Sequence, residues 1–337
     1  MNSSFRQSKC PVCYSTNLKT LRDVSSGEAA QHFILREANP SRNQNLKAHI
    51  ETLWGGGNCA MRQCQECDFG FSDPYVAGDA DFYNLAYERS GYPSDKWDYS
   101  RTVEELEVID FRAERVLEVG SGLGFFLDKL AGRFVPASGI TALEYHDNAI
   151  RSLHKKGYTA IQADFREVEL EPGFDAIFLF QVLEHMDRLD LLFARLNTLL
   201  RPGGIAIVSV PNSEQIWFNE LNGLLLDNPP NHIGRWSRKS LDLIGARHGL
   251  NLDKFEVQPF ALSDYIRQDI GSSYLRRTQR PGTLANWSRI RRSRPYGRLV
   301  GLMAAAAYAP LRLNAWRRAA KARLGGSYWA MYRKASS

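Results

Sequence analysis

Short hydrophobic runs alternate with helical segments through the middle of this chain. The runs predicted to be strands are Val116–Val119, Gly139–Glu144, Gly157–Ala163, Phe174–Gln181, Ile205–Val210 and Leu252–Val257. Phe174–Gln181 is apolar on both faces, as is typical of a strand buried in a parallel sheet. A last segment, Ser327–Arg333, alternates in hydrophobicity like a strand. The pattern predicts an α/β fold with a doubly wound, mostly parallel sheet.

The first run leads into three glycines at alternate positions, Gly120, Gly122 and Gly124, and then into a helix rich in leucine and phenylalanine. Glycines at the first βα turn let the backbone approach a nucleotide-type ligand closely. The dinucleotide pattern G-x-G-x-x-G is not met, because Phe125 and Leu127 stand where its last glycine would be. A tight turn without a ligand is the alternative interpretation.

Acidic residues stand at the ends of the first three predicted strands. Glu118 precedes the glycine turn, Glu144 lies twenty residues after Gly124, and Asp164 follows the third strand. A carboxylate at the end of the second strand can accept hydrogen bonds from both hydroxyls of a ribose. These positions therefore predict a ligand site along one edge of the sheet.

The acid followed by G-x-G-x-G resembles motif I of the class I S-adenosylmethionine (SAM) methyltransferases, and FDAIFLFQVLEH and LLRPGGIAIVSVPN resemble the family's later segments. The resemblance covers roughly residues 97–260 and the C-terminal strand. It implies a seven-stranded Rossmann-like sheet, with the last strand antiparallel beside the fifth. It also implies that SAM is the cofactor and that Asp164 holds the adenine amino group. The expected SAM-binding residues are Glu118, Gly120, Gly122, Gly124, Glu144, Asp164, Phe165 and Gln181.

Two C-x-x-C pairs stand in the N-terminal quarter, Cys10 with Cys13 and Cys64 with Cys67. Two such pairs offer four thiolates in the tetrahedral arrangement that Zn²⁺ prefers, and a closed four-thiolate site stabilises structure without catalysing. A redox pair or plain reduced cysteines are the alternatives, and Cys59 is expected to be a small core residue. The segment resembles the N-terminal module of bacterial methyltransferases that include sugar C-methyltransferases.

Two histidines are candidates for acid–base chemistry. His185 follows the fourth strand, and His232 lies on the loop after the fifth strand that covers the substrate in the methyltransferase family. Methyl transfer is an in-line displacement in which the enzyme positions the nucleophile and removes its proton. We expect His232 to be the base, with His185 as the second candidate; structural roles at a strand end or in bracing the loop are the alternatives. Sugar C-methyltransferases often have Glu-His on that loop, whereas this chain has Asn231.

Tyrosines and the Ser-Val-Pro-Asn segment bear on the acceptor. Tyr83, Tyr87 and Tyr99 either line the acceptor pocket or belong to the core. The segment Ser209–Asn212 departs from the Asn-Pro-Pro-Tyr motif with which amino-group methyltransferases of DNA and protein glutamine hold a planar nitrogen. We therefore expect an oxygen or carbon acceptor on a small molecule, such as a sugar or glycoconjugate precursor. A lipid-linked acceptor, RNA and a non-catalytic SAM-binding protein are the alternatives.

The 337 residues are enough for several units, and 44% of them are hydrophobic. We expect a zinc module at 1–75, an aromatic lid segment at 76–112 with a helix over Thr102–Phe111, a SAM-binding core at 113–262, a basic insertion at 263–325, and a final strand at 326–337. The longest apolar run, Leu299–Ala309, is shorter than the ~20 residues of a membrane span. Without a secretory signal, the expected compartment is the cytoplasm.

Charge is distributed unevenly along the chain. Fifteen lysines and arginines and no acid follow Asp269, although the whole chain has a net charge of only +6. The residues before that point are therefore acidic overall, and the C-terminal quarter is strongly basic. The basic segment at 276–323 could bind an anionic membrane surface at the inner face of the membrane, bind RNA, or simply be solvated. RNA is less expected, because the chain shows no RNA-binding module.

Overall fold

The structure is a computed structural model of the chain. It describes residues 8–87, 94–222, 227–278, 280–290, 299–300, 303, 306–307 and 309–336. Tyr92 of the aromatic segment and several arginines of the basic segment lie outside the described residues.

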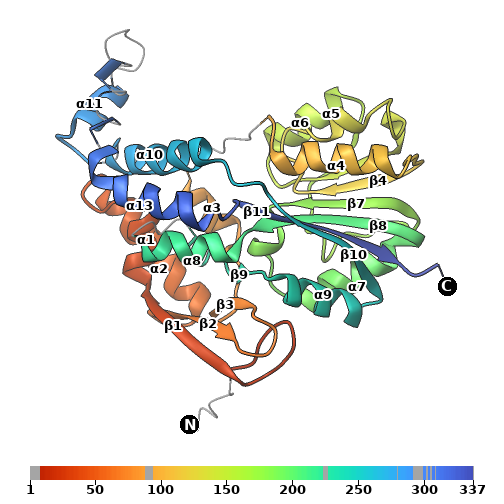
Figure 1. Cartoon of the computed structure of the whole chain (residues 1–337), viewed down its shortest axis with the longest axis horizontal. Coiled ribbons are helices and arrows are strands. Elements are labelled where there is room, and N and C mark those ends of the chain that lie inside the picture. The colour runs from red at the N-terminus through yellow and green to blue at the C-terminus, as the bar shows by residue number, and fades with distance from the viewer. Residues whose placement is uncertain are drawn as a thin grey trace.

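A seven-stranded sheet forms the larger half of the molecule (Figure 1). Its strand order is β10-β11-β8-β7-β4-β5-β6, and the strands from β8 to β6 are parallel. Strand β11 lies antiparallel between β8 and β10. The predicted fold, including the insertion of the last strand beside the fifth, is confirmed. The strand bounds are Val116–Val119 (β4), Ile140–Leu143 (β5), Thr159–Ile161 (β6), Phe174–Phe180 (β7), Leu200–Pro211 (β8), Leu250–Val257 (β10) and Ser327–Lys334 (β11).

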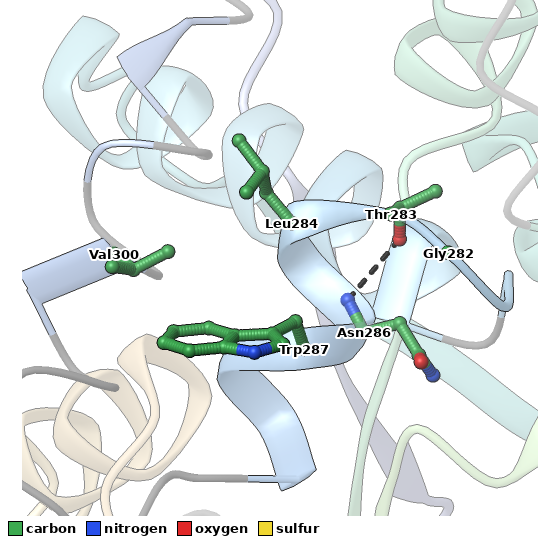
Figure 2. Close-up of a pocket in the computed structure, with 6 residues that line it drawn as sticks. All are labelled: Gly282, Thr283, Leu284, Asn286, Trp287 and Val300. Atoms are coloured by element: carbon green, nitrogen blue, oxygen red, sulfur yellow. Dashed lines mark hydrogen bonds between the residues drawn. The ribbon is translucent and has the colours of Figure 1, made fainter.

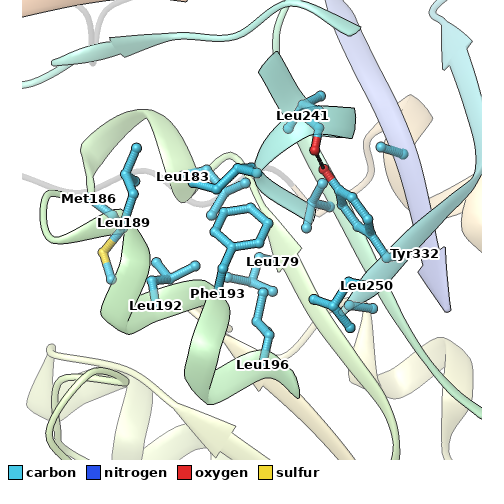
Figure 3. Packing of buried hydrophobic residues seen from close by; sticks show 14 of the residues in the cluster. Leu179, Leu183, Met186, Leu189, Leu192, Phe193, Leu196, Leu241, Leu250 and Tyr332 are labelled. Carbon is cyan, nitrogen blue, oxygen red and sulfur yellow. Dashed lines mark hydrogen bonds between the residues drawn. The ribbon is translucent and has the colours of Figure 1, made fainter. Parts of the chain in front are cut away.

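Helices cover both faces of this sheet. One face carries α4 (Trp97–Val108), α5 (Leu127–Leu130) and α6 (Asp147–Lys155), and the other carries α7 (Leu189–Leu199) and α9 (Arg238–Arg247) (Figure 1). The α7 and α9 side is filled by leucines, Phe193 and Tyr332 (Figure 3), and the Tyr332 hydroxyl donates to the Leu241 carbonyl at 2.9 Å. All seven residues of β7 are buried, because it is the middle strand of the sheet.

A second, four-stranded sheet belongs to the N-terminal module. It contains β1 (Leu18–Ser25), β2 (Asn58–Cys64), β3 (Gly70–Asp73) and the short β9 (Gly234–Arg235), in that order. Helices α1 (Ser26–Phe33), α2 (Pro40–Trp54) and α3 (Ala80–Ala86) pack into a separate core with it. Because β9 comes from the loop after the fifth strand of the large sheet, the module is completed by a distant part of the chain.

The expected lid segment at 76–112 is divided between the two units. Helix α3 packs in the N-terminal module through Phe82 and Ala86, whereas α4 packs on the large sheet through Tyr99 and Leu106. Helix α4 also starts at Trp97 and ends at Val108, earlier than the predicted Thr102–Phe111. Strand β8 starts at Leu200, earlier than the predicted Ile205, and its pairing with β7 is irregular near Phe174.

The basic segment forms helices on a third layer. Helices α10 (Leu262–Thr278), α11 (Leu284–Ile290) and α13 (Ala309–Ala322) lie near α8 (Ser213–Leu221) and α1, with α11 at the end of the molecule away from the large sheet (Figure 1). Short 3₁₀ helices η1 (Ala137–Gly139) and η2 (Leu183–His185) complete the elements used below. Among the described residues, no helix combines the length and hydrophobicity needed to span a membrane.

A buried ion pair links α8 to the strand that completes the N-terminal sheet. Arg235 on β9 donates to Glu220 at 2.9 and 2.6 Å, and both side chains are less than a tenth exposed. Arg22 on β1 also contacts Glu220, at 3.3 Å. Removing one partner of a buried pair leaves the other charge uncompensated, which is far costlier than losing a surface pair.

We predict that Glu220→Ala lowers the free energy of unfolding by about 3–5 kcal/mol, because Arg235 stays buried without its partner. The matched control is Asp253→Ala, which removes the exposed pair with Arg333 and should cost less than about 1 kcal/mol. Chemical denaturation followed by circular dichroism measures both variants. Equal small losses would show that β9 is held by its strand pairing alone.

Candidate functional site

The glycine turn after β4 has the backbone that its sequence predicts. Gly120, Gly122 and Gly124 have φ values of 72°, 53° and 76°, a region that residues with a Cβ rarely adopt. A Cβ at Gly120 would lie 2.9 Å from Val182, and one at Gly124 would lie 2.6 Å from Leu153. The turn therefore needs glycine both for its conformation and for the space around it.

Glu144, directly after β5, fastens this turn. Its Oε2 accepts from the Gly122 amide at 2.7 Å, and its Oε1 accepts from the amides of Tyr145 and His146 at 2.7 and 3.2 Å. The amides of Gly120 and Ser121 donate to the Leu143 carbonyl at the end of the same strand. The carboxylate predicted to hold a ribose is thus set against the glycine turn in a fixed orientation.

Two further carboxylates are buried beside the turn, each with an unpartnered oxygen among the described residues. These are Oε2 of Glu118, at 1% exposure, and Oδ1 of Asp98, at 3% exposure. Burial raises the pKa of both groups, and Lys96 partly offsets this effect. A buried carboxylate without a partner costs free energy, so the site suits a ligand that brings positive charge or hydrogen-bond donors.

Sequence reasoning missed Asp98. It lies in the first turn of α4, ahead of the first strand of the large sheet, and interacts with Ser209 and Gln181 at the ends of β8 and β7. The contact depends on how α4 packs across the sheet, so no local sequence motif predicts it. An acid in the first turn of a helix is ordinarily explained by the helix dipole.

The other predicted cofactor residues differ in how far neighbouring groups already engage their side chains. Gln181 follows β7 with φ of 59°, its amide donates to the Ser209 carbonyl, and its side chain reaches Ser209 and Ser327. Asp164 follows β6 and accepts from Arg166, whose Nε lies 2.9 Å from Oδ1. Burial alone would raise the pKa of Asp164, but Arg166 outweighs it and the net shift is downward. Phe165 is buried in the core, so its side chain is not offered to a ligand.

The two candidate histidines come together although 46 residues separate them. Their rings lie 4.7 Å apart, centroid to centroid, at an interplanar angle of 80°. His185 lies on η2 after β7, and its Nδ1 is 2.8 Å from the carbonyl of Asn231. His232 precedes β9, and its Nδ1 is 2.6 Å from Oδ1 of Asp227. Nδ1 of His185 is thus hydrogen-bonded and Nδ1 of His232 faces a carboxylate, which leaves Nε2 of each ring as the nitrogen for further chemistry.

The two rings titrate in opposite directions. Burial and the neighbouring His232 lower the pKa of His185 to about 3, so this ring is neutral at cellular pH. Burial would also lower the pKa of His232, but the adjacent carboxylate of Asp227 outweighs this effect and the net shift is upward from 6.5. Oε1 of Glu184 lies 3.9 Å from Nε2 of His185, and burial raises the pKa of Glu184 to about 7. The pair therefore combines one neutral imidazole with one that gains a proton easily.

The three tyrosines considered for the acceptor pocket occupy different places in the fold. The hydroxyl of Tyr83 lies 3.2 Å from Nδ1 of His185, and the Tyr83 ring stacks with Tyr87. Tyr87 is 43% exposed. Tyr99 packs against Phe126 and Phe180 in the core of the large sheet. Tyr83 and Tyr87 thus border the histidines, and Tyr99 is a core residue.

Two groups of side chains have the spacing of metal ligands. Sγ of Cys10 lies 3.5 Å from that of Cys67, and Sγ of Cys13 lies 3.4 Å from that of Cys64. A zinc tetrahedron with Zn–S bonds of about 2.3 Å needs Sγ separations of roughly 3.8 Å, close to those found. Glu184, His185 and His232 also offer ligand atoms within 4.8 Å of one another.

The two C-x-x-C pairs are built alike. The residue after each pair, Tyr14 or Asp68, has φ near 60°, and its amide donates to the carbonyl of the first cysteine. This repeated turn aims both sulfurs of a pair to one side. The cluster lies where the N-terminal sheet meets α9, since the Ser237 hydroxyl donates to the Cys67 carbonyl and Arg247 donates to that of Val12. Cys59 is buried in a different core, as expected.

Comparison with known proteins places this geometry in a family. A family model described as "Methyltransferase domain" matches residues 95–254. The ubiquinone biosynthesis O-methyltransferase of Dechloromonas aromatica is 26% identical over 203 residues, which are 58% of this chain and 71% of that protein. The (S)-coclaurine N-methyltransferase of Papaver somniferum is 27% identical over 137 residues, which are 36% of this chain and 38% of that protein. This chain therefore spans well under half of the poppy enzyme.

A solved structure is similar to this chain at low sequence identity. The cyclopropane synthase MmaA2 of Mycobacterium tuberculosis is 14% identical, with a TM-score of 0.46 over 76% of this chain and 94% of that one. The family match covers the described elements from the start of α4 to β10, including the glycine turn, Glu144 and His185. Residues 95–254 are therefore a methyltransferase domain of the class I, SAM-dependent family.

Proposed function

We propose that the protein transfers a methyl group from SAM to an oxygen or carbon atom of a small molecule, with a sugar or glycoconjugate precursor as the favoured acceptor. The observation that carries the proposal is the edge of the large sheet, where the glycine turn and three buried carboxylates lie close to a pair of histidines. The relatives named above act on different acceptors and support methyl transfer more than any one substrate.

The cofactor side fits SAM on chemical grounds. Glu144, already oriented by the turn, would accept from the ribose hydroxyls, and Asp164 with the residues around Phe165 would hold the adenine. Glu118 and Asp98, whose oxygens lack partners among the described residues, would compensate the ammonium and sulfonium charges. When bound, SAM supplies an electrophilic methyl group on a sulfonium. Gln181, after β7, would border that group.

We predict that Glu144→Ala weakens binding of S-adenosylhomocysteine about 10- to 100-fold, because hydrogen bonds to a charged group are lost. Isothermal titration calorimetry measures the affinity, which we expect in the micromolar range for the unmodified chain. The control, Glu171→Ala, changes an exposed acid before β7 and should bind normally. Tighter binding of NAD than of S-adenosylhomocysteine would refute the cofactor assignment.

On the acceptor side, His232 takes the proton of the reacting group. Asp227 holds its Nδ1, so Nε2 is the nitrogen that accepts the proton as the new bond to the methyl carbon forms. His185 lies beside it, and its low pKa keeps it uncharged. Tyr83, bonded to His185, and Tyr87 border the same space. The aromatic and imidazole groups suit a polar acceptor of sugar-like size.

The pKa of His232 sets the expected pH dependence. The ring acts as a base only when unprotonated, so the rate rises with pH through a pKa above 6.5. Asp227→Asn removes the charge that favours the imidazolium, and the acidic limb of the profile should shift to lower pH. Titration of the His232 ring signals by NMR measures the same shift without an acceptor. Asp190→Asn, which breaks the distant pair with His248, is the control.

Once an acceptor has been found, His232→Ala should turn over roughly 10² to 10⁴ times more slowly, with S-adenosylhomocysteine affinity unchanged. Coupled detection of S-adenosylhomocysteine release across a panel of nucleotide-linked and lipid-linked sugars serves both to find the acceptor and to measure the rate. Unchanged turnover in the variant across the pH range would show that the His232 loop is structural and that catalysis rests on proximity alone.

We also propose that the four N-terminal cysteines, Cys10, Cys13, Cys64 and Cys67, would hold one structural zinc ion. Four sulfurs at near-tetrahedral spacing make a closed site, and the ion would fix the two turns that support the β9 side of the module. In this role the metal contributes stability and leaves methyl transfer to the edge of the large sheet.

We predict one zinc ion per chain by atomic emission analysis of the purified protein, and loss of that zinc together with a lower thermal midpoint in Cys64→Ser. Cys59→Ser is the control, because Cys59 lies in a different core, and it should keep its zinc. If Cys64→Ser retained stoichiometric zinc, the metal would be bound at another site. The group formed by Glu184, His185 and His232 would then be the next site to test.

A further inference from the structure

Glu184 is a buried acid beside the two histidines, and the proposed reaction leaves it without a role. Its side chain is 1% exposed, and its Oε2 has no hydrogen-bond partner among the described residues. Its Oε1 lies 3.9 Å from Nε2 of His185, beyond the roughly 3.2 Å of a hydrogen bond. A buried carboxylate oxygen without a donor costs free energy, so this position suits a ligand that supplies one.

Nε2 of His185 is a second acceptor at the same place. Nδ1 of this ring lies 2.8 Å from the carbonyl oxygen of Asn231. Because a carbonyl only accepts, Nδ1 carries the proton, and Nε2 of the neutral ring has a lone pair. When Glu184 is ionised, two acceptors therefore face each other across 3.9 Å with no proton between them.

His232 contributes a third acceptor. Its Nδ1 lies 2.6 Å from Oδ1 of Asp227, so Nε2 of the unprotonated ring has a lone pair as well. One ligand atom from each of Glu184, His185 and His232 lies within 4.8 Å of the others. A hydroxyl group has a single O–H to donate. Two of these acceptors are therefore satisfied together only by a ligand with at least two donors close to each other.

The cluster of Glu184, His185 and His232 is held by the backbone and bordered by aromatic rings. The Ile233 amide donates to the Glu184 carbonyl at 2.8 Å, which keeps the loop of His232 against η2. The Tyr83 hydroxyl lies 3.2 Å from Nδ1 of His185, and the Tyr83 ring stacks with that of Tyr87. Aromatic surface with a few convergent polar atoms is the combination that a hydroxylated small molecule requires.

The open hollow of the third layer does not offer this chemistry. It has a volume of about 370 Å³ and lies beside α11, at the end of the molecule away from the large sheet. Figure 2 shows the residues that line it, which are Gly282, Thr283, Leu284, Asn286, Trp287 and Val300. None of these residues is an acid or a histidine that could take the proton of an acceptor hydroxyl. The acceptor therefore belongs beside Glu184 and the histidines.

We propose that Glu184 is a substrate-binding residue and that the acceptor carries two neighbouring hydroxyl groups, as a sugar or another polyol does. One hydroxyl is methylated, and the adjacent hydroxyl donates to the Glu184 carboxylate. The reacting oxygen bonds to the methyl carbon as the bond from that carbon to sulfur breaks, the sulfur keeps the electron pair, and the proton passes to Nε2 of His232. This inference rests on the proposed methyl transfer and adds the class of acceptor to it.

Nuclear magnetic resonance of the histidine ring signals tests the proposal without turnover. The full chain, saturated with S-adenosylhomocysteine, is titrated with cis-1,2-cyclohexanediol or with cyclohexanol, which lacks the second hydroxyl. The diol should shift the ring signals of His185 and His232 and bind at least about tenfold more tightly than cyclohexanol, because its second hydroxyl donates to a carboxylate. If neither compound shifts those signals, the proposal fails.

Glu184→Gln removes the charge and keeps the size of the side chain. It should weaken diol binding about tenfold and leave cyclohexanol binding unchanged. Both proteins are compared at alkaline pH, where His232 is unprotonated, because Glu184 is one of the charges that act against burial and raise the pKa of this ring. The matched control, Glu167→Gln, removes an exposed acid paired with Arg188 and should bind both compounds as the unmodified chain does.

The affinity of each variant for S-adenosylhomocysteine should stay constant, which shows that the fold and the cofactor site are intact. Absent binding of S-adenosylhomocysteine would count against the proposed function, whereas equal affinities for diol and cyclohexanol with S-adenosylhomocysteine bound would overturn this inference alone. That comparison is made on the unmodified chain, so it stands even if Glu184→Gln does not fold. Diol binding that appears only after Mg²⁺ is added would assign the three acceptors to a cation, and tighter binding of cis-2-aminocyclohexanol would assign them to an amine; either result would overturn the proposal.

Discussion

The position of Ile233 is the constraint on which the candidate site depends. Its carbonyl accepts from the Ser72 amide on β3 at 2.9 Å, and its amide donates to the Glu184 carbonyl after β7 at 2.8 Å. These two backbone bonds join the N-terminal module to the edge of the large sheet through a single residue. His232, immediately before Ile233, is thereby carried to His185. The zinc ion proposed at the N-terminal cysteines would, by fixing β3, also help to hold His232 beside His185, although the cysteines lie in a different part of the fold.

Electrostatics divides the edge of the sheet into two parts. Around the glycine turn, Glu118, Asp98 and Glu144 form a buried acidic region with Lys96 as a nearby cation. Around the loop that carries His232, two buried acids have basic partners: Asp227 meets His232, and Glu220 meets Arg235. Unpaired acids suit a cationic cofactor. An imidazole with a carboxylate partner suits the proton transfer proposed for His232.

The parts of this structure that follow from local sequence could be predicted from it. Buried strands, the glycine turn and Glu144 depend on residues close in the chain, and so do the two cysteine pairs. Asp98, β9 and the partition of residues 76–112 could not be predicted, because each depends on packing between segments far apart. The pairing of β3 with β9 joins Gly70 to Arg235, for example. His232 could be proposed as a base from its residue type and its place in a loop. Its contact with Asp227 could not be predicted, because it depends on how the loop folds.

Asn231 illustrates how the fold supplies what the local motif lacks. Sugar C-methyltransferases often place Glu before the loop histidine, and a side-chain amide at that position cannot provide the charge. Here the Asn231 backbone carbonyl accepts from Nδ1 of His185, while the carboxylate of Asp227 reaches Nδ1 of His232. A hydrogen bond to one ring nitrogen fixes the tautomer and leaves the other nitrogen for the reaction. The departure from the motif at Asn231 therefore leaves His232 with a carboxylate partner, Asp227, which lies five residues before it in the loop.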